Sequence, residues 1–452
     1  MIFRWFLPAA CLILAACAEV PEVAPPSSAK PVILGTKGPL TDRQSKALFV
    51  KLGPANQDLL QRHLAVEEAV AETPLMAGNK TRVLRDGPAT FAAMFEAIRA
   101  AQHHINLDFF ILEDLKSGAL SLGDLLVVKQ RQGVQVNIVY DAYGSIGTPQ
   151  IFFDRLAREG VHLVQFNPLN PLDAKAGYAP NERDHRKILI VDGRLAIVGG
   201  VNLSASYMSG ASHPSARPDE EPQLPWRDTD LEIEGPAVAQ LQHLFLDHWE
   251  AQKGPALDSA DFFPALQARG HEVVRIIGST PDHDVPRFYV TLLSAIRTAQ
   301  KRIWLNTAYF VPTRQEMEDL IAAAKRGADV RLVVPDASDS DLAIDVQHSR
   351  YEDLLEAGVQ IFETHDEILH SKSAVIDGVW SVIGSSNFDH RSVLFNDEVD
   401  AVVVGSDTAQ ELEALFAKDF ANANRIDPAV WKQRPFSQKM REAAARLTEP
   451  ML

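Results

Sequence analysis

The chain has 452 residues, 46% of them hydrophobic and 23% charged, so it is long enough for two globular domains or one large two-lobed domain. Its formal net charge is −16 and its pI is about 5.3, which disfavours a nucleic-acid-binding protein because such binding depends on clustered lysine and arginine. A local basic pocket inside an acidic surface stays compatible with these values.

The N-terminal segment MIFRWFLPAACLILAAC has one positive charge, a short apolar core and small residues before Cys17. The core is shorter than the ~20 apolar residues of a membrane-spanning helix, which predicts a signal peptide over residues 1–16. The small residues before the cysteine resemble the bacterial lipobox, which implies lipidation of Cys17; an ordinary signal peptide cut elsewhere is the alternative. The only cysteines are Cys11 and Cys17, so the mature chain would keep one thiol, which excludes a disulfide and a zinc–thiolate site.

Residues 17–40 are rich in proline and serine and lack hydrophobic periodicity, which predicts a flexible tether. No later segment has 18 consecutive apolar residues, so we expect a globular body that faces a membrane from outside it. We divide this body into a first half, residues 41–255, and a second half, residues 256–452.

The two halves repeat one pattern of helix ends and buried strands. AIRAAQHHINLDFF (97–110) matches AIRTAQKRIWLNTAYF (295–310), and KQRQGVQVNIVYD (129–141) matches AAKRGADVRLVVPD (323–336). Strands that alternate with helices predict an α/β fold in each half, and the long period indicates a duplicated domain rather than a solenoid.

Each half contains the pattern His-x-Lys-x-x-x-x-Asp-Gly, as DHRKILIVDG (184–193) and LHSKSAVIDG (369–378). The apolar runs predict buried strands, and each Asp-Gly predicts a tight hairpin turn. Positions i and i+2 of a strand point to the same side, so each motif presents an imidazole together with an ammonium group. Asn202 and Asn387 both follow their histidines by seventeen residues, which places each amide near its own His-Lys pair.

The paired segments HRKILIVDGRLAIVGGVN and HSKSAVIDGVWSVIGSSN resemble the phospholipase D superfamily. WRDTDLEIEGPAV (226–238), AYFVP (308–312) and SNFDHRSVLFNDE (386–398) look most like bacterial cardiolipin synthases. The resemblance covers nearly the whole mature chain. It implies a duplicated α/β sandwich with two pseudo-symmetric halves and an active site at their interface.

The motif residues fit phosphodiester chemistry without a metal or cofactor, which needs a nucleophile, a proton donor and fixed positive charge. One neutral imidazole would attack phosphorus, and the other would protonate the leaving alkoxide and then activate the acceptor hydroxyl. The pseudo-symmetry leaves the two roles open, and analogy with the family favours His185 as the nucleophile. The residues predicted to contact the substrate are His185, Lys187, His370 and Lys372, with Asn202 and Asn387 at the non-bridging oxygens.

Four carboxylates complete the predicted site. Alignment of LEIEG (231–235) with AVVVG (401–405) pairs Asp228 with Glu398, and we expect these two to orient the imidazoles. Asp192 and Asp377 belong to the family motif and are included as catalytic candidates. An aspartate before glycine in a tight turn also has a purely structural explanation, so both interpretations stay open for these two.

The predicted function is a phosphatidyltransferase that forms cardiolipin from phosphatidylglycerol through a phosphohistidine. The alternatives are a phospholipase D hydrolase, a phosphodiester nuclease, which the net charge disfavours, and a non-catalytic lipid-binding lipoprotein, which the two intact motifs disfavour. Two long polar segments, residues 167–184 and 208–225, are expected at the mouth of the site and to shape acceptor choice. Residue 18 is alanine, which by resemblance to other lipoproteins favours the periplasmic face of the outer membrane over the inner membrane. The acyl-chain preference and the oligomeric state stay open.

Overall fold

The computed structural model describes residues 20, 29–52, 57–117, 120–170, 172, 178–208, 224–257, 261–283, 285–338 and 340–452. The predicted signal peptide, Cys17, residues 18–19 and 21–28 of the predicted tether and residues 209–223 of the second long polar segment lie outside the described residues.

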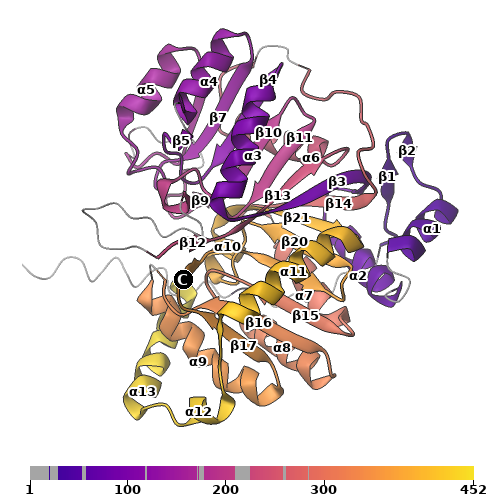
Figure 1. Ribbon diagram of the computed structural model, residues 1–452, viewed down its shortest axis with the longest axis vertical. Helices are drawn as coiled ribbons and strands as arrows, with labels where there is room; N and C mark the ends of the chain where they lie inside the picture. The colour runs from indigo at the N-terminus through magenta and orange to yellow at the C-terminus, as the bar shows by residue number, and fades with distance from the viewer. Residues whose placement is uncertain are drawn as a thin grey trace, which may run out of the picture.

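The first half is built on a mixed sheet in which three parallel strands continue into four antiparallel ones (Figure 1). Each parallel strand follows a helix in the chain. The antiparallel strands are the hairpin of the first motif and the strands next to it. Their order across the sheet is β8 (His162–Phe166), β7 (Gln135–Asp141), β4 (His104–Phe109), β10 (Lys187–Val191), β11 (Leu195–Gly199), β13 (Thr229–Glu234) and β3 (Leu75–Arg85).

The second half repeats this sheet strand for strand and with the same directions. Its order is β17 (Gln360–Thr364), β16 (Asp329–Pro335), β15 (Arg302–Asn306), β19 (Ser373–Ile376), β20 (Trp380–Gly384), β21 (Asn396–Val404) and β14 (Glu272–Ser279). The predicted duplicated α/β architecture is confirmed.

The strand β3 belongs to both sheets. Lys80 to Arg85 pair antiparallel with β13 of the first half, whereas Met76, Ala77 and Asn79 pair antiparallel with β14 of the second half. One backbone ladder therefore runs from one half into the other.

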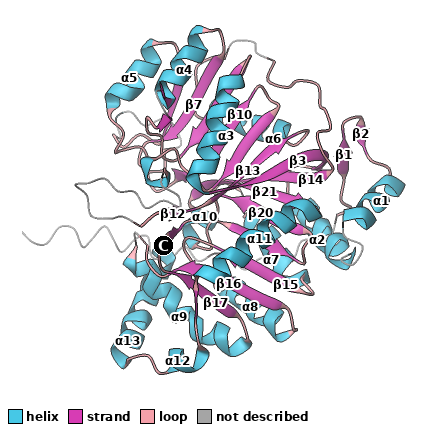
Figure 2. Ribbon diagram, viewed as in Figure 1, coloured by secondary structure: helices cyan, strands magenta, loops and turns pink. Residues whose placement is uncertain are grey.

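Helices cover the outer faces of both sheets (Figure 2). Reciprocal capping boxes start two equivalent helices, Ser121 with Asp124 and Thr313 with Glu316, and these caps satisfy amide groups that the helix itself leaves unpaired. The helices of the first half are α3 (Asp86–Ala100), α4 (Leu122–Arg131), α5 (Gln150–Arg158) and α6 (Val238–Ala251). Those of the second half are α7 (Arg287–Thr298), α8 (Arg314–Lys325), α9 (Asp341–Ala357), α10 (His390–Leu394), α11 (Ser406–Asn422), α12 (Pro428–Lys432) and α13 (Phe436–Ala445).

Shorter elements connect and extend these layers. The short strands are β1 (Ile33–Gly35), β2 (Gly38–Pro39), β5 (Lys116–Ser117), β6 (Leu120–Ser121), β9 (Arg183–Asp184), β12 (Trp226–Arg227), β18 (Ile368–Leu369) and β22 (Asn424–Arg425). The 3₁₀ turns are η2 (Ala205–Tyr207) and η3 (Arg446–Met451), and the N-terminal helices are α1 (Asp42–Leu52) and α2 (Gln57–Val70).

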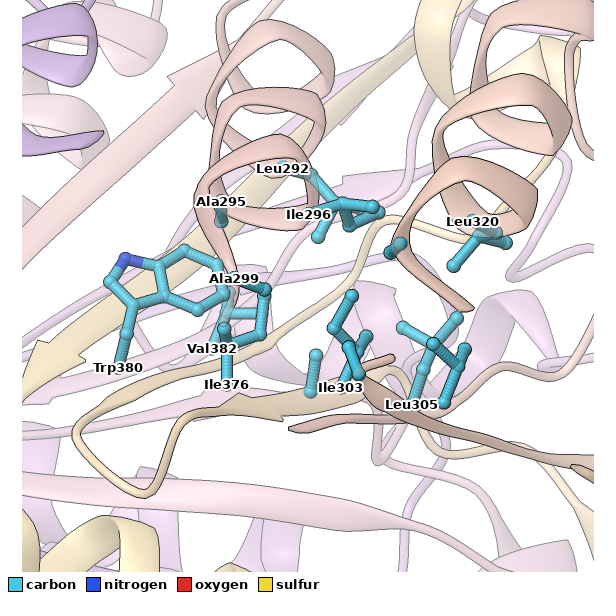
Figure 3. Close-up of a cluster of buried hydrophobic side chains, with 14 of the residues drawn as sticks. Leu292, Ala295, Ile296, Ala299, Ile303, Leu305, Leu320, Ile376, Trp380 and Val382 are labelled. Atoms are coloured by element: carbon cyan, nitrogen blue, oxygen red, sulfur yellow. The ribbon is translucent and has the colours of Figure 1, made fainter. Parts of the chain in front are cut away.

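The hydrophobic core has three main parts, one under the helices of each half and one between the halves. Figure 3 shows the core of the second half, where α7 and α8 place leucine, isoleucine and alanine over β15 and the β19–β20 hairpin. Trp380, which closes that hairpin, is fully buried there. The middle core joins Ile190 and Val198 of the first half to Val375 and Ile383 of the second.

The N-terminal helices do not pack where the predicted division at residue 255 puts them. Leu52 and Leu64 join the hydrophobic core of the second half, although the predicted division assigns them to the first half. Ile33, which lies in the predicted flexible tether, is buried in the same core, and its strand β1 pairs with β3, so this part of the tether is corrected to an ordered strand. Among the described residues, no helix combines the length and the apolar character needed to cross a membrane.

Candidate active site

The two histidine motifs meet because each is hydrogen-bonded to the opposite half. The strand β9 pairs in parallel with β21, and His185 N–H donates to the carbonyl of Asp397 at 2.9 Å. Likewise β18 pairs in parallel with β12, and His370 N–H donates to the carbonyl of Arg227 at 2.7 Å. The sequence pattern suggested that both histidines lie within the motif strands. In the structure they precede these strands, β10 and β19.

Each imidazole is held by a carboxylate from the other half. His185 Nδ1 donates to the two oxygens of Glu398 at 3.1 and 3.0 Å, and His370 Nδ1 lies 2.8 Å from Asp228 Oδ2. A hydrogen bond at Nδ1 fixes the ring orientation and leaves Nε2 as the nitrogen available to a substrate. The residues predicted as orienting carboxylates therefore lie against the histidines, and each acts across the interface.

The two carboxylates differ in their electrostatic surroundings. Burial on its own raises the pKa of Glu398, but His185, Lys187 and the Ser385 hydroxyl outweigh it, so the pKa of Glu398 lies below its usual value. Burial raises the pKa of Asp228 to about 6, against the opposing charge of Lys372. Glu398 is therefore the more firmly ionised of the two.

The lysines lie beside their own histidines, as the i, i+2 spacing predicts. Lys187 is fully buried and donates to the carbonyl of His185, and Lys372 donates to the carbonyl of His370. Burial lowers the pKa of Lys187 to about 7, while Glu398 opposes this shift. The ammonium groups are thus close to the places where phosphate oxygens would lie if either imidazole contacted phosphorus.

The two asparagines, predicted as equivalent substrate ligands, have different surroundings. Asn202 is buried; its side-chain oxygen accepts from Ile111 N–H at 3.1 Å and its amide donates to the Tyr207 hydroxyl at 3.1 Å. Asn387 lines a cavity, and its side-chain oxygen has no hydrogen-bond partner among the described residues. The side-chain groups of Asn202 therefore have partners within the protein, whereas Asn387 lies on the cavity, and the contact of either residue with the substrate stays a prediction.

Aromatic residues that the motif analysis did not single out surround His370. The hydroxyl of Tyr207 lies 3.1 Å from His370 Nδ1, and the Trp226 ring centroid lies 4.9 Å from the imidazole. Comparison of the two halves could not identify Tyr207, because the equivalent position in the second half is Ser392. The Ser392 hydroxyl accepts from Asn387 N–H. The surroundings of the two imidazoles are therefore chemically unequal.

Asp192 and Asp377 lie at the opposite ends of the motif strands from the lysines and have structural contacts. Both have positive φ, as do the glycines that follow them, which is the backbone geometry of the predicted tight turns. Asp192 accepts from the backbone N–H groups of residues 102–104 and Asp377 from those of residues 300–302, at 2.7–3.0 Å. These contacts support the structural interpretation of the two aspartates, since their carboxylates tie the motif hairpin to the preceding strand; a catalytic role stays a prediction.

A cavity of about 550 Å³ opens beside His185. Its wall combines apolar and polar residues from both halves, and the apolar ones include Phe110 and Tyr309. Leu169, Pro180, Asn181 and Arg183 line it as well, so the described part of the first long polar segment contributes to the site. Residues 209–223 of the other segment lie outside the described residues, and its predicted role stays a prediction.

Comparison with known proteins identifies a family for this arrangement. A family model described as "Cardiolipin synthase, PLD-like domain" matches residues 94–213 and 292–420, which contain both motifs. A cardiolipin synthase of Geobacillus thermodenitrificans is 34% identical over 89% of this chain and 77% of its own length. One of Alkalihalophilus pseudofirmus is 32% identical over 89% of this chain and 77% of its own length. The crystal structure of phosphatidylserine synthase from Haemophilus influenzae is similar in fold, with a TM-score of 0.62 at 14% identity over 85% of this chain and 99% of that chain.

Proposed function

Because the chain belongs to the cardiolipin synthase family and is an enzyme of the phospholipase D superfamily, we propose that it makes cardiolipin from phosphatidylglycerol. The observation that carries the proposal is the pair of histidines, each held through Nδ1 by a carboxylate of the other half. His185 lines the cavity, and the His370 ring lies 6.4 Å from that of Tyr309, which lines it too, so the two imidazoles can supply the nucleophile and the acid that a double displacement at phosphorus needs.

In the first step, Nε2 of one histidine attacks the phosphorus of phosphatidylglycerol. The phosphorus–oxygen bond to the headgroup glycerol breaks, the other histidine donates a proton to that oxygen, and glycerol leaves. A phosphatidyl-histidine then occupies the site, with Lys187 and Lys372 compensating the charge on the non-bridging oxygens.

In the second step, the headgroup hydroxyl of another phosphatidylglycerol attacks the phosphohistidine. The histidine that served as acid, now neutral, takes the hydroxyl proton, the phosphorus–nitrogen bond breaks, and cardiolipin leaves. Both histidines return to their starting protonation states, so the cycle needs no further reactant.

We assign the nucleophile to His185. This histidine lines the cavity, its partner Glu398 is ionised, and burial lowers the pKa of its imidazole, which favours the neutral ring. His370 has the Asp228 carboxylate and the Tyr207 hydroxyl at its Nδ1, and the carboxylate stabilises the protonated ring that a proton donor requires. The assignment agrees with the one favoured by family analogy.

Product analysis tests the proposed function. With residues 18–452 and phosphatidylglycerol in mixed micelles, we expect mass spectrometry to show cardiolipin and free glycerol in equal amounts. His370→Ala protein should form neither from this lipid. Phosphatidic acid as the sole lipid product of the wild type would instead identify a phospholipase D hydrolase, in which water replaces the lipid acceptor.

We also propose that Cys17 carries a lipid anchor that holds the enzyme at a membrane facing the periplasm. The proposal rests on the segment Leu14-Ala15-Ala16-Cys17, which precedes a stretch rich in proline. The wild-type full chain should label with a radioactive fatty acid and sediment with membranes, whereas Cys17→Ser should lose the label. A Cys11→Ser chain serves as the control and should keep it. Equal labelling of all three chains would contradict the anchor.

A further inference from the structure

The segment that carries His185 presents two different faces to two different cavities. Asn181, Arg183 and His185 line the catalytic cavity, whereas Glu182 and Arg186 line a separate cavity of about 450 Å³. This alternation is that of an extended chain, in which residues two apart share a face. Arg183 therefore lies on the same face as the nucleophile, roughly 6–7 Å along the backbone from it.

Arg183 is a buried cation with unused hydrogen-bonding capacity. Its residue is 8% exposed, and its Nη1 atom has no hydrogen-bond partner among the described residues. The nearest carboxylate oxygen, Asp141 Oδ1, lies 3.5 Å from that atom and already accepts from the backbone N–H groups of Tyr143 and Gly144. A buried guanidinium with an orphan N–H group is suited to an anionic ligand in the cavity that it lines.

A second guanidinium from the other half lies on the same wall. Arg391 of α10 donates to the side-chain oxygen of Asn181 at 3.2 Å and to its backbone carbonyl at 3.1 Å. Of the described residues that line the cavity, Asp389 is the only aspartate or glutamate, and it is occupied as the cap of α10, accepting from Ser392 N–H at 2.8 Å. Leu452 lines the cavity as well, and its carbonyl oxygen accepts from the backbone N–H of Arg391 at 3.2 Å. Two arginines thus continue the row of cationic groups outward from His185 and the lysines.

The reaction at a single phosphate does not require Arg183 and Arg391. The His-Lys pairs suffice for the phosphorus under attack, and water or a simple alcohol as acceptor brings no charge that needs neutralising. An acceptor phospholipid, by contrast, brings its own phosphate, joined to the attacking hydroxyl through a glycerol unit. We propose that Arg183 and Arg391 form the subsite for the acceptor's phosphate and so select a phosphorylated acceptor over water and neutral alcohols.

The inference rests on the proposed function, because it presupposes a phosphatidyl-histidine that accepts a second lipid. It adds that Arg183 and Arg391 determine which acceptor molecule reacts. The guanidinium group forms paired hydrogen bonds to phosphate that an ammonium cannot reproduce, so Arg183→Lys should restore only part of the selectivity that Arg183→Gln removes.

The test is a competition between acceptors. Wild type, Arg183→Gln, Arg183→Lys and Arg391→Gln are given phosphatidylglycerol micelles with ethanol, and cardiolipin, phosphatidylethanol and phosphatidic acid are quantified together. We expect the ratio of cardiolipin to phosphatidylethanol to fall about tenfold or more in Arg183→Gln, the effect of losing one charge-assisted hydrogen bond. Arg391→Gln should shift the ratio in the same direction by a smaller factor, since its guanidinium is already bound to Asn181. The control is Arg158→Gln, an exposed arginine on α5, which should match the wild type.

The outcomes are distinguishable. If all three products fall in parallel in both glutamine variants, the arginines have a structural or donor-side role, and the acceptor subsite is wrong. If the ratio stays at the wild-type value, the subsite is also wrong while the transferase stands. If the wild type itself makes no cardiolipin, both the transferase and the subsite are wrong. Because Arg183 is buried, Arg391→Gln on a half-exposed residue keeps the test decisive should Arg183→Gln fail to fold.

Discussion

Replacing His185 by alanine is expected to abolish reaction with every phosphodiester substrate, whereas replacing His370 is expected to spare the first turnover of substrates with a good leaving group. Without His185 no phosphohistidine can form. Without His370 the leaving alkoxide lacks its proton, which should cost about 10²–10⁴-fold with phosphatidylglycerol but little in the first turnover of a p-nitrophenyl phosphodiester, whose leaving group departs without a proton. The second step still lacks its base, so nitrophenolate release should be a burst of one molecule per site. The measurement is the release of glycerol and the burst of nitrophenolate by the two variants.

His103→Ala is the matched control, because that side chain is exposed and outside the site. A reversed pattern, with nitrophenolate release by His185→Ala alone, would interchange the roles of the two histidines. Loss of the nitrophenolate burst in both variants would show that His370 is needed in the first step for more than donating a proton to the leaving group.

Replacing Glu398 by glutamine is expected to lower kcat about 10²–10⁴-fold and to move the pH profile toward acid. The carboxylate holds His185 from the second half, and an amide in its place no longer stabilises the proton at Nδ1. Asp228→Asn should lower kcat through His370 in the same way, because that contact is the equivalent one.

The direction of the pH shift follows from the charges around Lys187. Its pKa is lowered to about 7 by burial, and Glu398 is the largest contribution that opposes this shift. Lys187 is charged below its pKa, so loss of Glu398 should let the ammonium deprotonate at a lower pH. Glu398 also raises the pKa of His185, so its loss should move the acid limb downward as well.

Profiles of kcat/KM for wild type, Glu398→Gln and Asp228→Asn across about pH 5 to 9 would measure this shift. The displacement of the alkaline limb should be larger for Glu398→Gln than for Asp228→Asn, because Asp228 is a smaller contribution at Lys187. An alkaline limb that stays in place in Glu398→Gln would show that Lys187 does not control it.

The fold and the family were predictable from the sequence because their signals are local and occur twice. Apolar runs such as ILIV at 188–191 lie in buried strands, and the Asp-Gly pairs at 192–193 and 377–378 form the turns. Alignment of the halves also placed Asp228 and Glu398 at equivalent positions. It could not show that each contacts the histidine of the other half, since strand pairing between halves leaves no local pattern in the chain.

Three features required the three-dimensional structure. Leu52 and Leu64 pack in the second half although the predicted division assigns them to the first, because tertiary packing and not sequence order decides which apolar face a helix covers. Asn202 and Asn387 differ because Tyr207 in one half corresponds to Ser392 in the other, a difference that motif matching ignores. The structural role of Asp192 became apparent only through its contacts with residues 102–104, about ninety positions earlier.

The strand β3, which pairs with β13 and with β14, limits how the enzyme can handle lipids of different size. The separation of the two histidines is set by backbone hydrogen bonds, and widening it would require breaking that ladder. Catalysis is therefore expected to proceed without domain closure. Adaptation to a bulkier headgroup must then come from the side chains and loops around the cavity, which can change in evolution while the distance between the reacting nitrogens stays constant.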